Sequence, residues 1–203
     1  MHVPPMCVCG NIFRGKILAS VSKNLFSVAG KTALITGGGS GIGGFMAQSL
    51  ADEGASILLV GRREDKLKEV LGARDGSIFV IDLSEAGASQ RLFKMVTDRG
   101  YQPDIIVNAA GINPRLHADE IDEDMWNYTV HLNLNVPFLV AQKFVPAMQA
   151  NRWGRIINIA SMQSSRAFPN GISYGAAKGG VTQLTRAMAE AWSALGVTAN
   201  ALA

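Results

Sequence analysis

Short apolar runs alternate along this chain with longer stretches in which apolar residues recur at helical spacing. Because helical stretches separate the runs, the pattern predicts right-handed βαβ units and an α/β fold, with a doubly wound parallel sheet between two helical layers. Pro137 and Pro146 fall inside the longest helical stretch and predict a kink or a break there. We predict strands at Lys31–Thr36, Ser56–Val60, Ser77–Ile81, Ile105–Val107, Arg155–Ile159 and Val197–Leu202. We predict helices after Gly41 and at Glu64–Leu71, Glu85–Asp98, Glu123–Gln149 and Tyr174–Ala194.

The beginning of the chain lacks this pattern, because Met1–Asn24 has no clear periodicity and is interrupted by Pro4-Pro5, Gly10 and Gly15. We predict a flexible extension at residues 1–24 and one domain at residues 25–203. A misassigned start is an alternative, and so is a transit peptide, although the extension holds few arginines. We expect a cytoplasmic protein, or a mitochondrial one if the extension is a transit peptide.

Charge, hydropathy and cysteine content exclude several classes of protein. The net charge of the 203 residues is +3, and three basic residues but no acid lie in the extension, so the remainder is neutral. This excludes the basic field typical of nucleic-acid binding, and no apolar run approaches a membrane span. Cys7 and Cys9 are too few for a disulfide framework, which favours a reducing compartment. Together with His2 they make a weak zinc candidate on a tail, and we expect no metal.

A glycine-rich turn follows the first predicted strand and precedes a stretch of helical spacing. Glycines permit a tight turn and let backbone N–H groups reach a pyrophosphate at the start of a helix. The order strand, turn, helix therefore favours a dinucleotide-binding Rossmann fold over an ordinary loop. The turn is Gly37-Gly38-Gly39-Ser40-Gly41-Ile42-Gly43.

Tyr174 and Lys178 are four residues apart in a run rich in alanine and glycine, so on a helix they lie one turn apart on one face. An ammonium about 5 Å from the phenol would favour the phenolate by roughly 3 kcal/mol at an effective dielectric near 20. Such a tyrosine can serve as a general acid and base. Ordinary amphipathic helices also carry this spacing, so it indicates a catalytic pair only together with the other motifs.

These motifs together resemble the classical short-chain dehydrogenase/reductase family over residues 25–203. The glycine spacing is Gly-x-x-x-Gly-x-Gly, and Ser161 precedes Tyr174 by thirteen positions, as in that family. The further motifs that carry the resemblance are Asn108-Ala109-Ala110-Gly111, Asn133, and Tyr174 with Lys178.

The resemblance implies four catalytic residues. Tyr174 would protonate the carbonyl oxygen as hydride arrives and act as the base in reverse. Lys178 would hold the ribose hydroxyls of the nicotinamide half and favour the phenolate. Ser161 would stabilise charge developing on the substrate oxygen, and Asn133 would hold a water that links Lys178 to solvent. Taken alone, Asn133 is more typical of a helix-interior amide and Ser161 of a strand-end hydroxyl than of catalytic residues.

The resemblance also implies the cofactor site. The phosphates would lie at the glycine turn, and Asp82 would lie at the adenine ring with Leu83 beside it, although a helix cap is the alternative for Asp82. Ala109 stands where the family usually has a second asparagine. The implied cofactor residues are Gly37, Ser40, Gly41, Ile42, Gly43, Arg62, Asp82, Leu83, Asn108, Ala109, Ala110, Gly111, Tyr174 and Lys178.

The end of the second predicted strand bears on the choice between NADP and NAD. An acid there would bind the ribose 2′-hydroxyl of NAD, but this chain has Gly61 followed by Arg62-Arg63. A guanidinium can pair with the 2′-phosphate of NADP, so we prefer NADP and keep NAD as the alternative. Ser40 is neutral where NADP-using relatives have a basic residue, and Arg63 could be an ordinary solvated charge.

The implied reaction is hydride transfer between a cofactor and a small secondary alcohol or ketone. The chain resembles the gluconate and deoxygluconate dehydrogenase-like branch, which suggests a sugar acid, and a 3-oxoacyl thioester is the alternative. Ile112–Arg115 and Gln163–Arg166 would flank the pocket, where Arg115 or Arg166 could bind a carboxylate or be a surface charge.

The sequence stops at Ala203, at the family's sixth strand. The family continues with Pro-Gly, a helical segment over the substrate and a last strand, so we expect one pocket wall to be missing. The second hypothesis is therefore a truncated, non-catalytic dinucleotide-binding or interaction module. Its helices Glu123–Gln149 and Tyr174–Ala194 correspond to a dimer interface of the family, so we expect a homo-oligomer.

Overall fold

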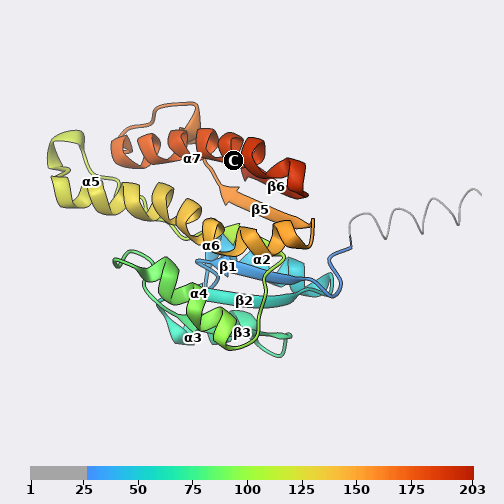
Figure 1. The fold of residues 1–203 in the computed structure, drawn as a ribbon. Coiled ribbons are helices and arrows are strands. Elements are labelled where there is room, and N and C mark those ends of the chain that lie inside the picture. The colour runs from blue at the N-terminus through green and yellow to red at the C-terminus, as the bar shows by residue number, and fades with distance from the viewer. Residues whose placement is uncertain (1–26) are drawn as a thin grey trace, which may run out of the picture.

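Six parallel strands form the centre of the computed structural model, which describes residues 27–203 (Figure 1). Their order in the sheet is β3-β2-β1-β4-β5-β6, so the winding direction reverses between β1 and β4. In open α/β sheets the crevice at such a reversal, outside the carboxyl ends of the strands, is where ligands bind. The strands are β1 (Thr32–Thr36), β2 (Ser56–Gly61), β3 (Gly76–Val80), β4 (Ile105–Asn108), β5 (Gly154–Ile159) and β6 (Val197–Leu202).

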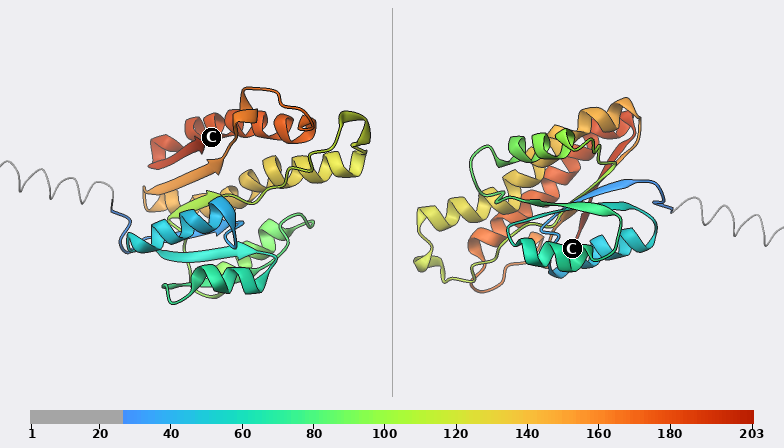
Figure 2. Two further views of the ribbon diagram at one scale, coloured as in Figure 1. Left: turned by 180° about the vertical axis from the view of Figure 1, so that it is seen from behind. Right: turned by 90° about the horizontal axis from the view of Figure 1, so that it is seen from below.

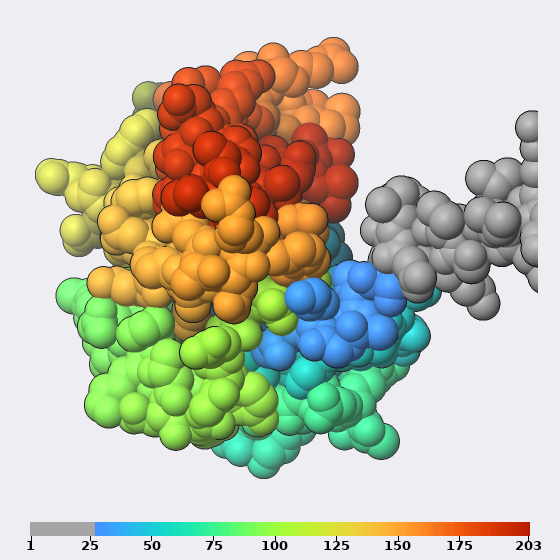
Figure 3. Space-filling view, turned by 45° about the vertical axis from the view of Figure 1, so that its right-hand side comes forward, coloured from blue at the N-terminus to red at the C-terminus, as the bar shows by residue number. Residues whose placement is uncertain are grey.

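Helices cover both faces of this sheet, as the two views of Figure 2 show. Successive side chains of a strand point to opposite faces, so Leu34 of β1 packs into one core and Ala33 and Ile35 into the other. The first core lies under α4, α6 and α7, which follow one another across that side in the space-filling view (Figure 3). The second lies under α2 and α3. The helices are α2 (Gly41–Asp52), α3 (Glu64–Leu71), α4 (Ala88–Asp98), α5 (Glu123–Val130), α6 (Val136–Ala150) and α7 (Ile172–Trp192).

The predicted three-layer fold is therefore confirmed, and most element bounds agree within two residues. α3 and β6 have the predicted bounds. The helix predicted from Glu85 begins only at Ala88, because Gly87 before it adopts a left-handed φ of 71°. Tyr174 was predicted as the first residue of its helix, but α7 begins at Ile172.

The long helix predicted at Glu123–Gln149 is three segments in sequence rather than one regular helix. Between α5 and α6, residues His131–Asn135 form a π-helical turn in which the backbone N–H of Val136 bonds to the carbonyl of His131. Pro137 follows directly and has no N–H to continue the α-helical ladder. Pro146, in contrast, lies inside α6 without ending it. The predicted irregularity thus occurs just before Pro137, and Pro146 does not break the helix.

The predicted N-terminal extension and its zinc candidates, Cys7, Cys9 and His2, lie outside the described residues. Within residues 27–203, no helix is both long and apolar enough to cross a membrane. The same part of the chain holds no group of three or more side chains that could share a metal ion.

Candidate active site

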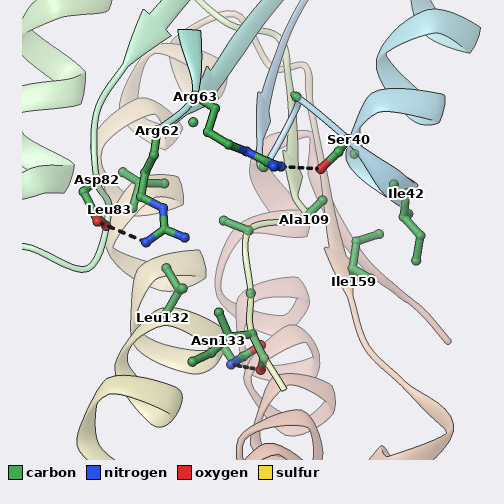
Figure 4. Close-up of a pocket in the computed structure, with 18 of the residues that line it drawn as sticks. Ser40, Ile42, Arg62, Arg63, Asp82, Leu83, Ala109, Leu132, Asn133 and Ile159 are labelled. Atoms are coloured by element: carbon green, nitrogen blue, oxygen red, sulfur yellow. Dashed lines mark hydrogen bonds and ion pairs between the residues drawn. The ribbon is translucent and has the colours of Figure 1, made fainter. Parts of the chain in front are cut away.

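A cleft of about 420 Å³ opens at the carboxyl ends of the central strands, where the sheet reverses direction (Figure 4). It is lined by the glycine turn, the ends of β2 and β3, the loop after β4, the π-helical turn and the first turns of α7. Among the predicted catalytic and cofactor residues, Asn108 and Ser161 are the two that do not line it, and the predicted substrate residues Arg115 and Arg166 do not line it either. Those that do are Gly37, Ser40, Gly41, Ile42, Gly43, Arg62, Asp82, Leu83, Ala109, Ala110, Gly111, Asn133, Tyr174 and Lys178.

At two positions of the glycine turn, Gly37 and Gly43, the backbone packs so closely that a side chain would not fit. A Cβ atom on Gly37, whose φ is 68°, would lie 2.8 Å from the backbone nitrogen of Ala110. A Cβ on Gly43 would lie 2.5 Å from the carbonyl oxygen of Gly37. Helix α2 starts here without an acid in its first turn, and Ser40 makes no side-chain cap bond within the described chain. The first N–H groups of α2 therefore remain available to an anion, which fits a pyrophosphate.

The loop after β4 is held by hydrogen bonds from beneath. The Thr36 hydroxyl oxygen accepts from the backbone N–H groups of Ala109 and Ala110, both at 3.2 Å. The Asn108 side chain turns into the core instead, where its Nδ2 donates to Asn158 Oδ1 at 2.8 Å and to the Pro137 carbonyl at 3.2 Å. Asn108 thus joins β4 to β5 and α6, while the residues after it face the cleft.

Two arginines follow β2 and diverge across the cleft, as Figure 4 shows. Arg62 Nη1 lies 3.4 Å from Asp82 Oδ2 and 3.4 Å from the Tyr128 hydroxyl. Arg63 Nη2 instead donates to the Ser40 hydroxyl oxygen at 3.2 Å, above the glycine turn. Arg63 therefore brings a positive charge to the turn position where Ser40 itself is neutral.

The pKa of Asp82 reflects opposing influences. Partial burial raises the pKa, but hydrogen bonds from the hydroxyl and backbone N–H of Ser84, together with the charge of Arg62, hold it below its ordinary value. The carboxylate is therefore charged at neutral pH and offsets part of the positive charge of Arg62.

Lys178 is almost completely buried, with 5% of its surface exposed. Its ammonium donates a hydrogen bond to the carbonyl of Ile159 at the end of β5 and lies 5.5 Å from the centre of the Tyr174 ring. Burial lowers the pKa of Lys178 from 10.5 to about 8, so the side chain is still mostly charged at pH 7. Tyr174 and Lys178 thus share the face of α7 that lines the cleft, as their spacing predicted.

Asn133 sits in the π-helical turn with its amide turned toward the loop after β4. Its Nδ2 donates to the carbonyls of Ile112 and Thr129, both at 2.9 Å. Its Oδ1 is buried and has no hydrogen-bond partner among residues 27–203. A Cβ atom on Gly111 would collide with this oxygen and lie 3.9 Å from Lys178 Nζ, so Gly111 lies between the two side chains.

Ser161 lies two residues after the end of β5 and caps the start of a short 3₁₀ turn, η3 (Met162–Ser164). Its hydroxyl oxygen accepts a hydrogen bond from the backbone N–H of Gln163 at 3.1 Å. The hydroxyl proton therefore remains free to be donated to another group. A second cavity, of about 610 Å³, lies beside this turn and is lined by Leu116, His117, Ala118, residues 163–172, Gly175 and Ala176.

The sequence model of the short chain dehydrogenase family matches residues 31–203. The chain belongs to this family. The resemblance inferred from the motifs is thereby confirmed.

Individual relatives agree with the gluconate-like branch without fixing a substrate. The chain is 37% identical over 186 residues to 2-dehydro-3-deoxy-D-gluconate 5-dehydrogenase of Bacillus subtilis, covering 88% of this chain and 71% of the relative. A gluconate 5-dehydrogenase of Burkholderia cenocepacia, solved with NADP and tartrate, is 35% identical with a TM-score of 0.82, covering 89% and 72%.

A second kind of reductase fits the structure equally well. A 3-oxoacyl (acyl-carrier-protein) reductase of Agrobacterium tumefaciens, solved with NADP, has a TM-score of 0.84 at 27% identity, covering 89% of this chain and 72% of that one. The chain spans 64–73% of the length of the curated relatives it matches.

In this short-chain dehydrogenase, motif reasoning missed several residues of the cleft. Lys66 lies in the first turn of α3, shortly after the two arginines. The helix predicted at Glu64–Leu71 already implied that Lys66 lies near the end of β2. Leu132 directly precedes Asn133, Ile159 is the last residue of β5, and both also line the cleft. The divergence of Arg62 and Arg63 depends on tertiary partners and has no signal in the local sequence.

Proposed function

We propose that this chain is an NADP-preferring oxidoreductase that interconverts a secondary alcohol and a ketone, with Tyr174 as the general acid and base. The observation that carries the proposal is the single cleft that joins the glycine turn to Tyr174 and a buried, charged Lys178. The bound cofactor would supply or accept the hydride. The chain's own residues would supply the proton and stabilise charge at the substrate oxygen.

Each polar side chain has a role that fits its contacts. Tyr174 gives its proton to the carbonyl oxygen in reduction and removes a proton in oxidation. Lys178 supports that transfer electrostatically and holds the ribose hydroxyls. The Ser161 hydroxyl, which already accepts from Gln163, donates to the substrate oxygen and stabilises the developing charge. Asn133 would hold a water that links Lys178 to solvent, which is the role that the family resemblance implies.

The charge of the cleft supports NADP as the preferred cofactor. Four basic side chains and one acid line it, the basic ones being Arg62, Arg63, Lys66 and Lys178 and the acid Asp82. An extra phosphate suits this excess of positive charge, and a guanidinium binds phosphate through two parallel hydrogen bonds. Structural relatives are solved with NADP bound, which points the same way.

For the substrate we propose a small hydroxy or keto acid of the sugar-acid class. The relatives of the gluconate branch and the structure that holds tartrate, a hydroxy dicarboxylate, support this class. A 3-oxoacyl thioester is the second candidate, because such reductases are also among the relatives.

We also propose a homo-oligomer that forms through α5, α6 and α7. Ala176, Ala187 and Ala191 are exposed on α7, and at helical spacing they lie on one face. Such small residues would let a helix of a second copy approach closely. Light scattering of the purified chain would test this, and a monomer at all concentrations would contradict it.

The function is tested with Tyr174→Phe and a matched variant, Tyr101→Phe, whose hydroxyl lies beside Ser77 away from the cleft. We expect Tyr174→Phe to lower turnover of sugar-acid or 3-oxoacyl substrates at least about 100-fold while NADPH binding, followed by fluorescence, stays within about twofold. Tyr101→Phe should retain turnover. Comparable turnover in Tyr174→Phe would refute the catalytic assignment. NADPH binding without turnover in the parent chain would favour the non-catalytic module.

A further inference from the structure

One hydroxyl group links the backbones of two proposed catalytic residues. Ser164, the last residue of η3, receives a hydrogen bond on its Oγ from the backbone N–H of Ser161 at 3.2 Å. The same hydroxyl donates its proton to the backbone carbonyl of Lys178 at 2.8 Å. Both bonding directions of this hydroxyl are therefore used, one toward β5 and one toward α7.

The close approach of η3 to α7 makes such a short bridge possible. A Cβ atom on Gly171 would collide with the Gln163 side chain, and one on Gly175 would lie 3.4 Å from Gln163 Oε1. A Cβ on Gly179 would lie 3.8 Å from the Ser164 carbonyl. Because these three positions are glycines, η3 packs directly against the backbone of α7. Serine has the shortest hydroxyl side chain, and it reaches the Lys178 carbonyl from there.

We propose that Ser164 is a positioning residue that fixes the Ser161 hydroxyl relative to the Tyr174–Lys178 turn of α7. Ser161 and Tyr174 must act on the same substrate oxygen, yet they belong to different elements. The Ser164 hydroxyl connects the two elements, η3 and α7, through its hydrogen bonds with the Ser161 N–H and the Lys178 carbonyl. This inference rests on the proposed function only where turnover is concerned, since the hydrogen bonds themselves can be measured separately.

The reason for a kinetic effect is geometric. Misplacing a reacting group by about 1 Å can cost about 100-fold in rate. Loss of the bridge would let η3 shift on α7 and would move the Ser161 donor, while the phosphate and ribose contacts of the cofactor stay in place. The effect should therefore fall on kcat and leave the affinity for NADPH unchanged.

The experiment compares Ser164→Ala with Ser164→Thr and with Ser193→Ala. Threonine keeps the hydroxyl, and Ser193 is a matched control whose hydroxyl donates to the Ala189 carbonyl at the far end of α7. We expect Ser164→Ala to lower kcat about tenfold or more, with NADPH affinity within about twofold. The deuterium isotope effect on kcat with labelled NADPH should increase, because hydride and proton transfer become slower relative to product release. Ser164→Thr should recover part of the rate, and Ser193→Ala should match the parent chain.

A loss of folded protein would lower the number of NADPH-binding sites but would leave the isotope effect unchanged, and that result would refute the positioning role. Amide hydrogen exchange measured by NMR supplies a readout without turnover. In Ser164→Ala the N–H groups of Ser161 and Gln163 should exchange faster, while those of the glycine turn should keep their rates. Unchanged exchange at Ser161 would overturn the proposal even if the chain proves to have no dehydrogenase activity. Faster exchange together with an inactive parent chain would support the bridge and refute the proposed function alone.

Discussion

The glycine turn and the first turns of α7 line the same cleft, but the sequence builds them in opposite ways. At the glycine turn, contacts form because side chains are missing, as at Gly37 and Gly43. At α7, the site depends on polar side chains brought into the interior, above all Lys178. The first region should thus be sensitive to added atoms, which affect cofactor binding. The second should be sensitive to removed polar groups, which affect proton transfer and pH dependence.

The largest effect that separates the two regions is the pH dependence of stability due to Lys178. The unfolded chain keeps this lysine protonated up to about its ordinary pKa of 10.5, whereas burial lowers the pKa in the folded chain to about 8. Between these values the unfolded state binds more protons, so the free energy of unfolding should rise with pH, by about 3 kcal/mol in total. Lys178→Met should lack this rise and be more stable than the parent chain at pH 7.

Urea unfolding between pH 7 and pH 10 checks this prediction. Lys94→Met, which removes a surface lysine paired with Asp98 on α4, is the control and should keep the slope of the parent chain. If Lys178→Met has the same slope as the parent chain, the buried ammonium does not cause the pH dependence.

The next effect concerns added atoms at the glycine turn. Gly43→Ala places a Cβ atom 2.5 Å from the rigid carbonyl of Gly37, so we expect a loss of about 2 kcal/mol in stability and at least tenfold weaker NADPH binding. Gly44→Ala is the matched control on the same helix, because its Cβ would lie 3.4 Å from a Val70 methyl group. Thermal unfolding and NADPH fluorescence distinguish the two. Equal losses in both variants would show that the close contact with Gly37 is not the cause.

A smaller effect is expected at a buried polar network beneath the cleft. Asn158 accepts from Asn108 and donates to the Thr185 hydroxyl at 2.9 Å, which joins β4, β5 and α7. Asn158→Leu should cost about 1.5 kcal/mol because Asn108 and Thr185 each lose a partner in the interior. Denaturant unfolding measures this, with Asn200→Ala on the exposed side of β6 as a control. A cost no larger than that of the control would mean that the network adds nothing to stability.

The sequence predicted the parts of this molecule that depend on local pattern. The fold followed from alternating apolar runs, and Tyr174 and Lys178 followed from helical spacing, since both need only neighbours along the chain. The interruption near Pro137 was predicted, but its form, a π-helical turn around Asn133, was not, because a proline in a helical pattern does not specify which hydrogen bonds replace the regular ones. The inward side chain of Asn108 and the bridge through Ser164 were missed because their partners are distant in sequence. Local pattern thus placed the backbone of the site, and tertiary packing decided which way its polar atoms face.

The smallest effect tests the arginines, whose different partners the sequence did not reveal. Arg62 shares its charge with Asp82, whereas Arg63 donates to the neutral Ser40 hydroxyl above the glycine turn. We therefore expect Arg63→Gln to weaken NADPH binding about tenfold, close to 1.4 kcal/mol, and Arg62→Gln to weaken it less. NADH affinity should change little in either variant, because NADH lacks the 2′-phosphate. Fluorescence titration of both variants with both cofactors measures this. A larger loss of NADPH affinity in Arg62→Gln would show that Arg62 makes the phosphate contact. An equal loss of NADH affinity would show that neither guanidinium binds the 2′-phosphate.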